Sequence, residues 1–142
     1  MCIRDSACGT LAVPAFAQAP QHGEKMGYIA TTYTAEVLPG QMDNFKKLVP
    51  AIIAATAKEP GTLMYEWNMR ADGKTFDVVE LYQSSDAVIA HINHVVPEFG
   101  KTLGEVQKTV SFTIYGTPND AAKKAIAGFN PTYTTPIDGY TR

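Results

Sequence analysis

The strongest constraint on the fold is the order in which two hydrophobic periodicities follow each other along residues 27–115. Alternation of apolar and polar side chains is typical of a half-buried strand, whereas apolar residues three and four apart indicate an amphipathic helix. The alternating pattern predicts four strands, at residues 27–37, 62–70, 76–83 and 109–115. The helical pattern predicts two helices, one between Gly40 and Pro60-Gly61 and one that begins at Ser84-Ser85-Asp86. The predicted order is therefore β-α-β-β-α-β.

Proline residues interrupt both predicted helices. Pro50 and Pro97 fall inside the apolar patterns, where a proline removes a backbone hydrogen bond and costs about 3 kcal/mol. We therefore expect a bend at Pro50 and a division of the second helix into two pieces at Pro97. After residue 116, Thr117 is predicted to cap a short helix that starts at Pro118 and ends at Gly128. The residues that follow are expected to form a strap over the domain or over a second subunit.

This order of elements is that of the ferredoxin-like α+β fold, an antiparallel sheet with both helices on one face. The other sheet face has no predicted helix to cover it, although several strands carry large apolar side chains on both faces. Packing of that face against a second copy of the chain would remove it from water. We therefore expect a homodimer.

Residues 1–19 differ in character from the rest of the chain. Residues 7–19 are mostly small and apolar, they end at Ala17-Gln18-Ala19, and the chain then becomes polar. This pattern predicts a secretory leader with its cleavage site, and hence a secreted or periplasmic protein; the alternative is an ordinary buried N-terminal segment. The basic start of such a leader is missing, and residues 1–6, MCIRDS, look like a foreign lead-in. Both cysteines, Cys2 and Cys8, lie in this leader, so that no thiolate chemistry is expected in the mature chain.

Length and charge limit the classes of function. A chain of 142 residues accommodates one domain, and we place a linker at 20–26, the domain at 27–116 and the short helix and strap at 117–142. Twelve Lys and Arg oppose 14 Asp and Glu, which gives a net charge of −2 without a basic run, so that nucleic acid is not an expected partner. No apolar run approaches the ~18 residues of a membrane span. Neither a Ser-His-Asp order nor a nucleotide-binding glycine motif is present.

Three stretches carry a family resemblance: VLPGQMDNFKKLVPAIIAATAKEPGTLMYEW, DVVELYQSSDAVIAHINH and TVSFTIYG. Over residues 29–115 the chain resembles the antibiotic biosynthesis monooxygenase domains. The resemblance implies a dimeric α+β barrel with an aliphatic and aromatic pocket between the sheet and the helices. It also implies oxidation of a small phenol or quinol by dioxygen without a metal or a flavin. The expected partners are therefore a small aromatic substrate, dioxygen and a second subunit.

His91 and Glu80 are the candidate catalytic residues. An imidazole can accept the proton of a phenol near neutral pH, and the resemblance places a histidine at this helix position, after an alanine. Glu80 shares a strand face with apolar residues and could orient His91 as the carboxylate of a His–Glu pair. The alternatives are a histidine at the core boundary that a backbone carbonyl satisfies, and a structural ion pair of Glu80 with Arg70 or a lysine.

Six further side chains are the candidate substrate-binding residues: Tyr33, Tyr65, Trp67, Asn68, Tyr82 and His94. Tyr65 and Trp67 share one face of their predicted strand. If the helices cover that face, their rings would line a pocket suited to a flat aromatic substrate; taken singly, each is equally typical of a core. His91 and His94 would need Glu80 or Glu98 as a third metal ligand, and no metal site is predicted.

The favoured function is a cofactor-independent monooxygenase that oxidises a small quinol or phenol. One alternative is an exported module that binds a small hydrophobic ligand without catalysis, since this fold hosts many roles. The other is a relative that binds or degrades haem, for which the sequence offers no obvious axial-ligand pattern beyond His91.

Overall fold

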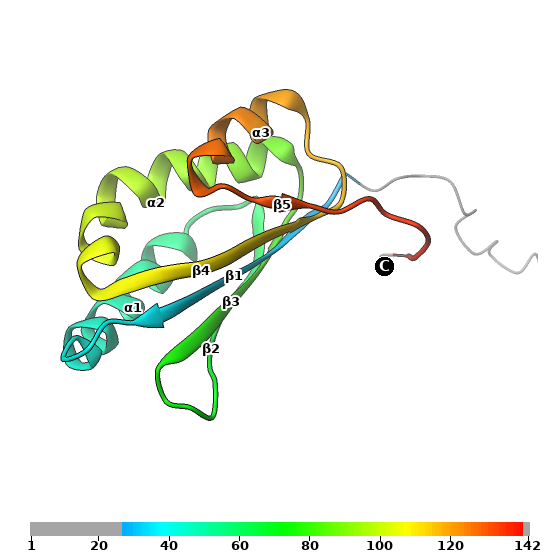
Figure 1. Ribbon diagram of the computed structural model, residues 1–142. Coiled ribbons are helices and arrows are strands. Elements are labelled where there is room, and N and C mark those ends of the chain that lie inside the picture. Colours follow the sequence, from blue (N-terminus) through cyan, green and yellow to red (C-terminus); the bar gives the residue numbers. More distant parts are fainter. Residues whose placement is uncertain (1–26, 141–142) are drawn as a thin grey trace, which may run out of the picture.

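A five-stranded sheet covered on one face by helices occupies residues 27–140, the part of the chain that the computed structural model describes (Figure 1). The strands are β1 (Ile29–Val37), β2 (Thr62–Met69), β3 (Thr75–Tyr82), β4 (Gln107–Tyr115) and β5 (Thr132–Tyr133). The helices are α1 (Met42–Thr56), α2 (Ser85–Val106), α3 (Asp120–Ile126) and the short 3-10 helix η1 (Ala127–Phe129). The expected leader at 1–19 and linker at 20–26 lie outside the described residues.

The sheet has the strand order β2-β3-β1-β4-β5. β1 pairs antiparallel with β3 and β4, and β2 pairs antiparallel with β3, whereas β5 runs parallel to β4. The predicted ferredoxin-like α+β fold is therefore confirmed. The short β5 comes from the predicted strap and adds an edge strand, which makes the sheet mixed rather than purely antiparallel.

The β2–β3 hairpin turns at Asp72-Gly73, as its sequence predicts. Gly73 has a φ of 70°, which glycine adopts without strain. The carboxylate of Asp72 accepts hydrogen bonds from the Thr75 hydroxyl and from the backbone N–H groups of Lys74 and Thr75, which together lower the pKa of Asp72 to about 2. The turn fixes a register in which Tyr65 lies opposite Glu80.

Both helices continue through their prolines. α1 includes Pro50 and ends at Thr56. α2 is one helix of 22 residues that includes Pro97, so the predicted division at Pro97 is wrong. Val95 and Phe99, on either side of Pro97, are buried together with Ile52. Burial of such side chains contributes about 1.5–3 kcal/mol each, which offsets the cost of about 3 kcal/mol for one proline in a helix.

The helix of the C-terminal region begins later than predicted and packs on the domain. Asn119, not Thr117, caps α3, and its side chain accepts a hydrogen bond from the backbone N–H of Ala122. Asparagine caps helices at least as well as threonine, so the helix starts after the stronger cap. α3 lies against α2 (Figure 1), and Ile126 joins a core cluster with Ile29 and Val88. Within residues 27–140, no helix is long and apolar enough to cross a membrane.

Candidate functional site

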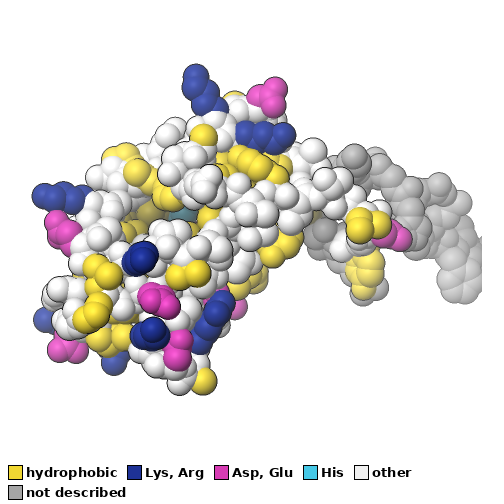
Figure 2. All heavy atoms as spheres, in the orientation of Figure 1, with side chains coloured by type: hydrophobic (Ala, Val, Ile, Leu, Met, Phe, Trp, Pro, Cys, Tyr) yellow, Lys and Arg dark blue, Asp and Glu magenta, His cyan; other side chains and the backbone are white. Residues whose placement is uncertain are grey.

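A cavity of about 320 Å³ lies between α2 and the helix-covered face of the sheet. Figure 2 shows a hollow between α2 and β4, rimmed by hydrophobic side chains, with a histidine side chain visible inside. One face of α2 lines the cavity from His91 to Gly104, and Phe129 of η1 closes it from the C-terminal region. The sequence-predicted site residues in the lining are Tyr33, Tyr65, Trp67, Glu80 and His91.

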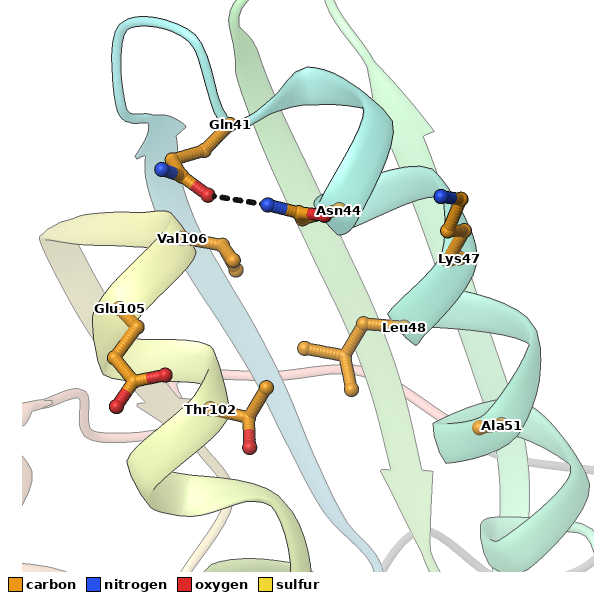
Figure 3. A pocket seen from close by; sticks show the side chains of 8 residues that line it. All are labelled: Gln41, Asn44, Lys47, Leu48, Ala51, Thr102, Glu105 and Val106. Carbon is orange, nitrogen blue, oxygen red and sulfur yellow. Dashed lines mark hydrogen bonds between the residues drawn. The ribbon is translucent and has the colours of Figure 1, made fainter.

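A second hollow, of about 490 Å³, lies between α1 and α2 on the outside of the domain. Figure 3 shows its polar rim, where Asn44 donates a hydrogen bond of 2.8 Å to the side chain of Gln41, and its small apolar floor around Leu48. Its side chains include Lys47 and Glu105 but neither a histidine nor an aromatic ring. The cavity beneath α2 is therefore the better candidate for chemistry on an aromatic ligand.

His91 is placed by the helical periodicity of α2, which turns it towards the sheet. The residue is buried, 4% exposed, and its ring lies between the rings of Tyr65 and Tyr82, each 5.4 Å away between ring centres. Nδ1 of His91 lies 2.9 Å from Oε2 of Glu59, and Nε2 lies 3.9 Å from Oε1 of Glu80. A carboxylate partner, rather than the backbone carbonyl considered from the sequence, thus satisfies this histidine.

Glu59 is a candidate site residue that the sequence did not reveal. It follows α1 in a turn, where Gly61 packs directly on α2: a Cβ on Gly61 would lie 2.6 Å from the Cβ of Ala87. This close approach brings the Glu59 carboxylate to His91. The available signal was Glu59's place in the Glu-Pro-Gly segment of the stretches that carry the family resemblance.

The protonation of Glu59 follows from its partners. Burial raises the pKa of this carboxyl, but hydrogen bonds from Thr62, His91 and His94 outweigh burial and leave the pKa below its usual range. An ionised carboxylate can only accept hydrogen bonds, so Nδ1 of His91 is the donor to Glu59. In a neutral imidazole the other nitrogen then carries the lone pair. Nε2 of His91, on the side of Glu80, is therefore available as a base.

Glu80 is buried beside this base. Its exposed fraction is 7%, and the hydroxyl of Thr31 donates a hydrogen bond to Oε2. Burial raises the pKa of Glu80, because a buried carboxylate loses its hydration, although His91 and Thr31 oppose the shift. The alternative ion pair with Arg70 is wrong, since Arg70 binds Asp77 at 2.8 Å. Asp77 lies three positions before Glu80 on β3, so its side chain points to the opposite sheet face.

Aromatic side chains form the wall of the cavity. The ring of Trp67 stacks on Phe76 with 5.3 Å between ring centres and an interplanar angle of 13°, and Tyr65 meets Trp67 edge-on at 6.0 Å. Nε1 of Trp67 has no hydrogen-bond partner within the described residues. A buried donor without a partner costs about 1–3 kcal/mol, so an acceptor on a ligand would be favoured at this wall.

Polar side chains meet at the β4 end of the cavity. Gln107 donates a hydrogen bond of 2.8 Å from Nε2 to the hydroxyl of Tyr33, which lies 2.6 Å from the hydroxyl of Thr109. Burial raises the pKa of Tyr33, so it stays a neutral phenol. Oε1 of Gln107 has no partner in the part of the chain that the structure describes. This end can hydrogen-bond a ligand but supplies no base.

Three sequence-predicted residues do not line the cavity. Asn68 lies opposite Asp77 on the helix-free face and is exposed. Tyr82 is 2% exposed and packs behind His91 in the core. His94 is partly exposed and binds Glu59 from the solvent side. Among residues 27–140, no three histidine, cysteine, aspartate or glutamate side chains are arranged to hold a metal ion.

Comparisons with known proteins agree with this fold. The family model of the antibiotic biosynthesis monooxygenases matches residues 28–103. MupZ from Pseudomonas fluorescens superposes with a TM-score of 0.72 at 19% identity, over 81% of this chain and 94% of its own. Rv0793 from Mycobacterium tuberculosis has a TM-score of 0.57 at 24% identity, and the match covers 66% of this chain and 98% of Rv0793. SnoaB, a cofactor-independent oxygenase from Streptomyces nogalater, has a TM-score of 0.57 at 12% identity, and the match covers 66% of this chain and 95% of SnoaB. No curated protein sequence matches the chain.

Proposed function

Because the chain belongs to the antibiotic biosynthesis monooxygenase family, we propose that it oxidises a small phenol or quinol with dioxygen, without a metal or an organic cofactor. The observation that carries this proposal is the placement of His91. Its Nδ1 is held by an ionised carboxylate, and its ring lines a cavity with aromatic walls. This arrangement supports proton abstraction from a flat hydroxyaromatic ring.

The reaction balances with substrate and dioxygen alone. Nε2 of His91 takes the proton of the phenolic O–H, and the phenolate transfers one electron to dioxygen. The phenoxyl radical and superoxide combine at a ring carbon that carries hydrogen, which gives a peroxide anion. Protonation of the peroxide, loss of that carbon's proton and cleavage of the O–O bond release water and leave a quinone carbonyl.

The neighbours of His91 have separate roles in this scheme. Glu59 orients the imidazole and stabilises its charged form, as a carboxylate does for a catalytic histidine. Glu80, whose pKa burial raises, can donate a hydrogen bond to the developing phenolate in its neutral form. The rings of Tyr65 and Trp67 hold the substrate plane. Positioning and electrostatic stabilisation thus supply what a cofactor would otherwise provide.

Oxygen uptake tests the proposal. Metal-stripped protein is supplied with hydroquinones and naphthols, and dioxygen consumption is measured together with quinone formation. We expect turnover by the wild type, a loss of about 10²–10⁴-fold in His91→Gln, and no change in Asn93→Gln, an exposed position on the same helix. Saturable binding of these compounds without oxygen uptake would contradict catalysis and favour the ligand-binding module.

We also propose a homodimer through the helix-free sheet face. The strand register places Met64, Leu81, Ala30 and Tyr115 side by side in one row on this face, and Tyr115 is 45% exposed. Contact with a second copy would cover this apolar row. Light scattering should give twice the mass of one chain, and Leu81→Asp should give a monomer. A wild-type monomer at micromolar concentration would refute the dimer.

We further propose that the protein is exported. The support is the small apolar stretch at residues 7–19, which ends at Ala17-Gln18-Ala19. A chain given a basic start should be cleaved after Ala19, which N-terminal sequencing of the secreted product checks. Retention in the cytoplasm would contradict export without affecting the proposed chemistry.

A further inference from the structure

We propose that His94 and Glu98 form, with Glu59, a proton relay that connects His91 to bulk water. The proposal rests on the proposed function in one respect, because it assumes that His91 takes a proton from a phenol in the cavity. It assigns a role to two side chains outside the cavity and predicts that the abstracted proton leaves by a defined route.

Four side chains form a continuous line of alternating imidazoles and carboxylates. Nδ1 of His91 lies 2.9 Å from Oε2 of Glu59, and Oε1 of the same carboxylate lies 2.6 Å from Nδ1 of His94. Nε2 of His94 then lies 3.3 Å from Oε2 of Glu98, one helical turn further along α2. Side-chain exposure rises along this line, from 5% at His91 through 11% and 37% to 54% at Glu98. The line therefore begins at the cavity and ends in solvent.

The shared carboxylate couples the two imidazoles. When His91 gains a proton at Nε2, its ring and the ring of His94 both interact with the single negative charge of Glu59. The titratable and charged groups around this point are Glu59 after α1, Glu80 on β3, and His91, His94 and Glu98 on α2. In this relay His94 is an imidazolium at rest, because each of its nitrogens faces a carboxylate oxygen. The Nδ1 proton of His91 passes to Oε2 of Glu59, which then no longer balances the charge of His94, and the Nε2 proton of His94 leaves to Glu98 or water. The protein takes one proton from the substrate O–H and gives one to the bulk, so the step balances and His91 ends neutral.

This route serves the proposed chemistry because the base is buried. A proton that stays on His91 lies beside the phenolate and can return to it. This return competes with electron transfer from the phenolate to dioxygen. A proton passed to the solvent end leaves the phenolate anionic within the cavity. The same line can carry a proton back when the peroxide is protonated.

A non-oxidisable phenol isolates this step from oxygen chemistry. 4-Nitrophenol carries a nitro group at the ring position para to its oxygen, and its phenolate absorbs in the visible range. In stopped-flow mixing at a pH where most free 4-nitrophenol is protonated, the phenolate band reports abstraction, and a red-absorbing pH indicator in weak buffer reports proton release. The variants are His94→Gln and Glu98→Gln. Glu105→Gln is the control, because Glu105 is an exposed glutamate of α2 that lines the second hollow, between α1 and α2 (Figure 3).

In the wild type and in Glu105→Gln, proton release should follow the phenolate band without delay. In His94→Gln, the phenolate should still form, but proton release should slow by about 10²-fold, the loss typical of a missing proton-transfer group. Glu98→Gln should slow release less, because water can replace it. A merely structural role of His94 would not separate the two signals.

The outcomes keep the relay and the proposed function apart. Equal release rates in His94→Gln and wild type would overturn the relay, whatever the oxygen uptake. Absence of the phenolate band in a wild type that binds 4-nitrophenol would also overturn it. Coupled phenolate formation and proton release without oxygen uptake from any oxidisable phenol would leave the relay standing and refute the proposed monooxygenase.

Discussion

Replacement of Glu59 by glutamine removes a charge while it preserves the shape of the site. In the folded protein Oε2 of Glu59 accepts hydrogen bonds from Thr62 and His91, and Oε1 faces His94. A glutamine can keep its carbonyl oxygen at the Oε2 position, and its amide nitrogen can donate to Nδ1 of His94 in the tautomer that carries its proton on Nε2. The orientation of His91 is then retained, and the change isolates the electrostatic contribution of Glu59.

The size of this contribution follows from the geometry. Two unit charges 2.9 Å apart, at an effective dielectric constant of about 20, attract by about 6 kcal/mol. Delocalisation of the charges over the carboxylate and the ring, with partial solvent access, reduces this attraction to about 3 kcal/mol. Loss of that attraction corresponds to a decrease of about 10²-fold in rate. We expect kcat/KM for oxygen uptake to fall by about 10²-fold, with substrate affinity unchanged because Glu59 does not line the cavity.

The stability of Glu59→Gln provides a second readout with a defined sign. Hydrogen bonds leave the pKa of Glu59 lowered in the folded state, so its contribution is present above the unfolded pKa of about 4.3 and is lost as pH falls through the folded value. Urea unfolding should show a less stable variant at neutral pH and a shrinking difference in acid. Wild-type turnover in a folded Glu59→Gln protein, with normal activity of the Glu105→Gln control, would refute the role of Glu59.

Three further substitutions test other parts of the account. Trp67→Ala removes a half-buried ring that stacks on Phe76, and it should raise KM and lower the free energy of unfolding by about 2–4 kcal/mol; an unchanged KM in steady-state kinetics would exclude Trp67 from the binding wall. Burial raises the pKa of Glu80, so the folded protein loses stability as pH rises from about 4.3 towards that raised value. Glu80→Gln should therefore be more stable than wild type at alkaline pH, by about 1.4 kcal/mol for each unit by which the pKa of Glu80 is raised. If denaturant unfolding shows no pH-dependent gain in stability for the variant, the raised pKa of a buried Glu80 carboxyl is contradicted. Pro97→Ala should stabilise α2 by about 1–3 kcal/mol, because it restores a backbone N–H inside a continuous helix; a lower melting temperature would mean that the proline ring itself stabilises the fold.

The fold was predictable because local patterns and tertiary packing agree along most of the chain. The alternation at residues 62–70 places Tyr65 and Trp67 on one face, and the helices cover that face. Helical periodicity likewise turns His91 inward. Pro97 shows where local rules fail, since packing of Val95 and Phe99 keeps α2 continuous despite the lost hydrogen bond.

The remaining site residues depend on long-range packing that no local pattern records. Glu59 reaches His91 across 32 positions of sequence, and it does so because Gly61 allows the turn after α1 to lie against α2. Phe129 enters the cavity only because α3 packs on α2 and positions η1. Such residues carry no periodicity of their own, and a turn glutamate looks like any other solvated charge until its partner is placed.

Isotope labelling tests the central claim most directly. Metal-stripped wild-type protein is incubated with a naphthol under ¹⁸O-labelled dioxygen, and the product and the solvent are analysed by mass spectrometry. The account predicts a quinone with one labelled oxygen atom, an equal amount of labelled water, and loss of both in His91→Gln. A quinone that carries only solvent oxygen, or equal product in His91→Gln, would contradict it.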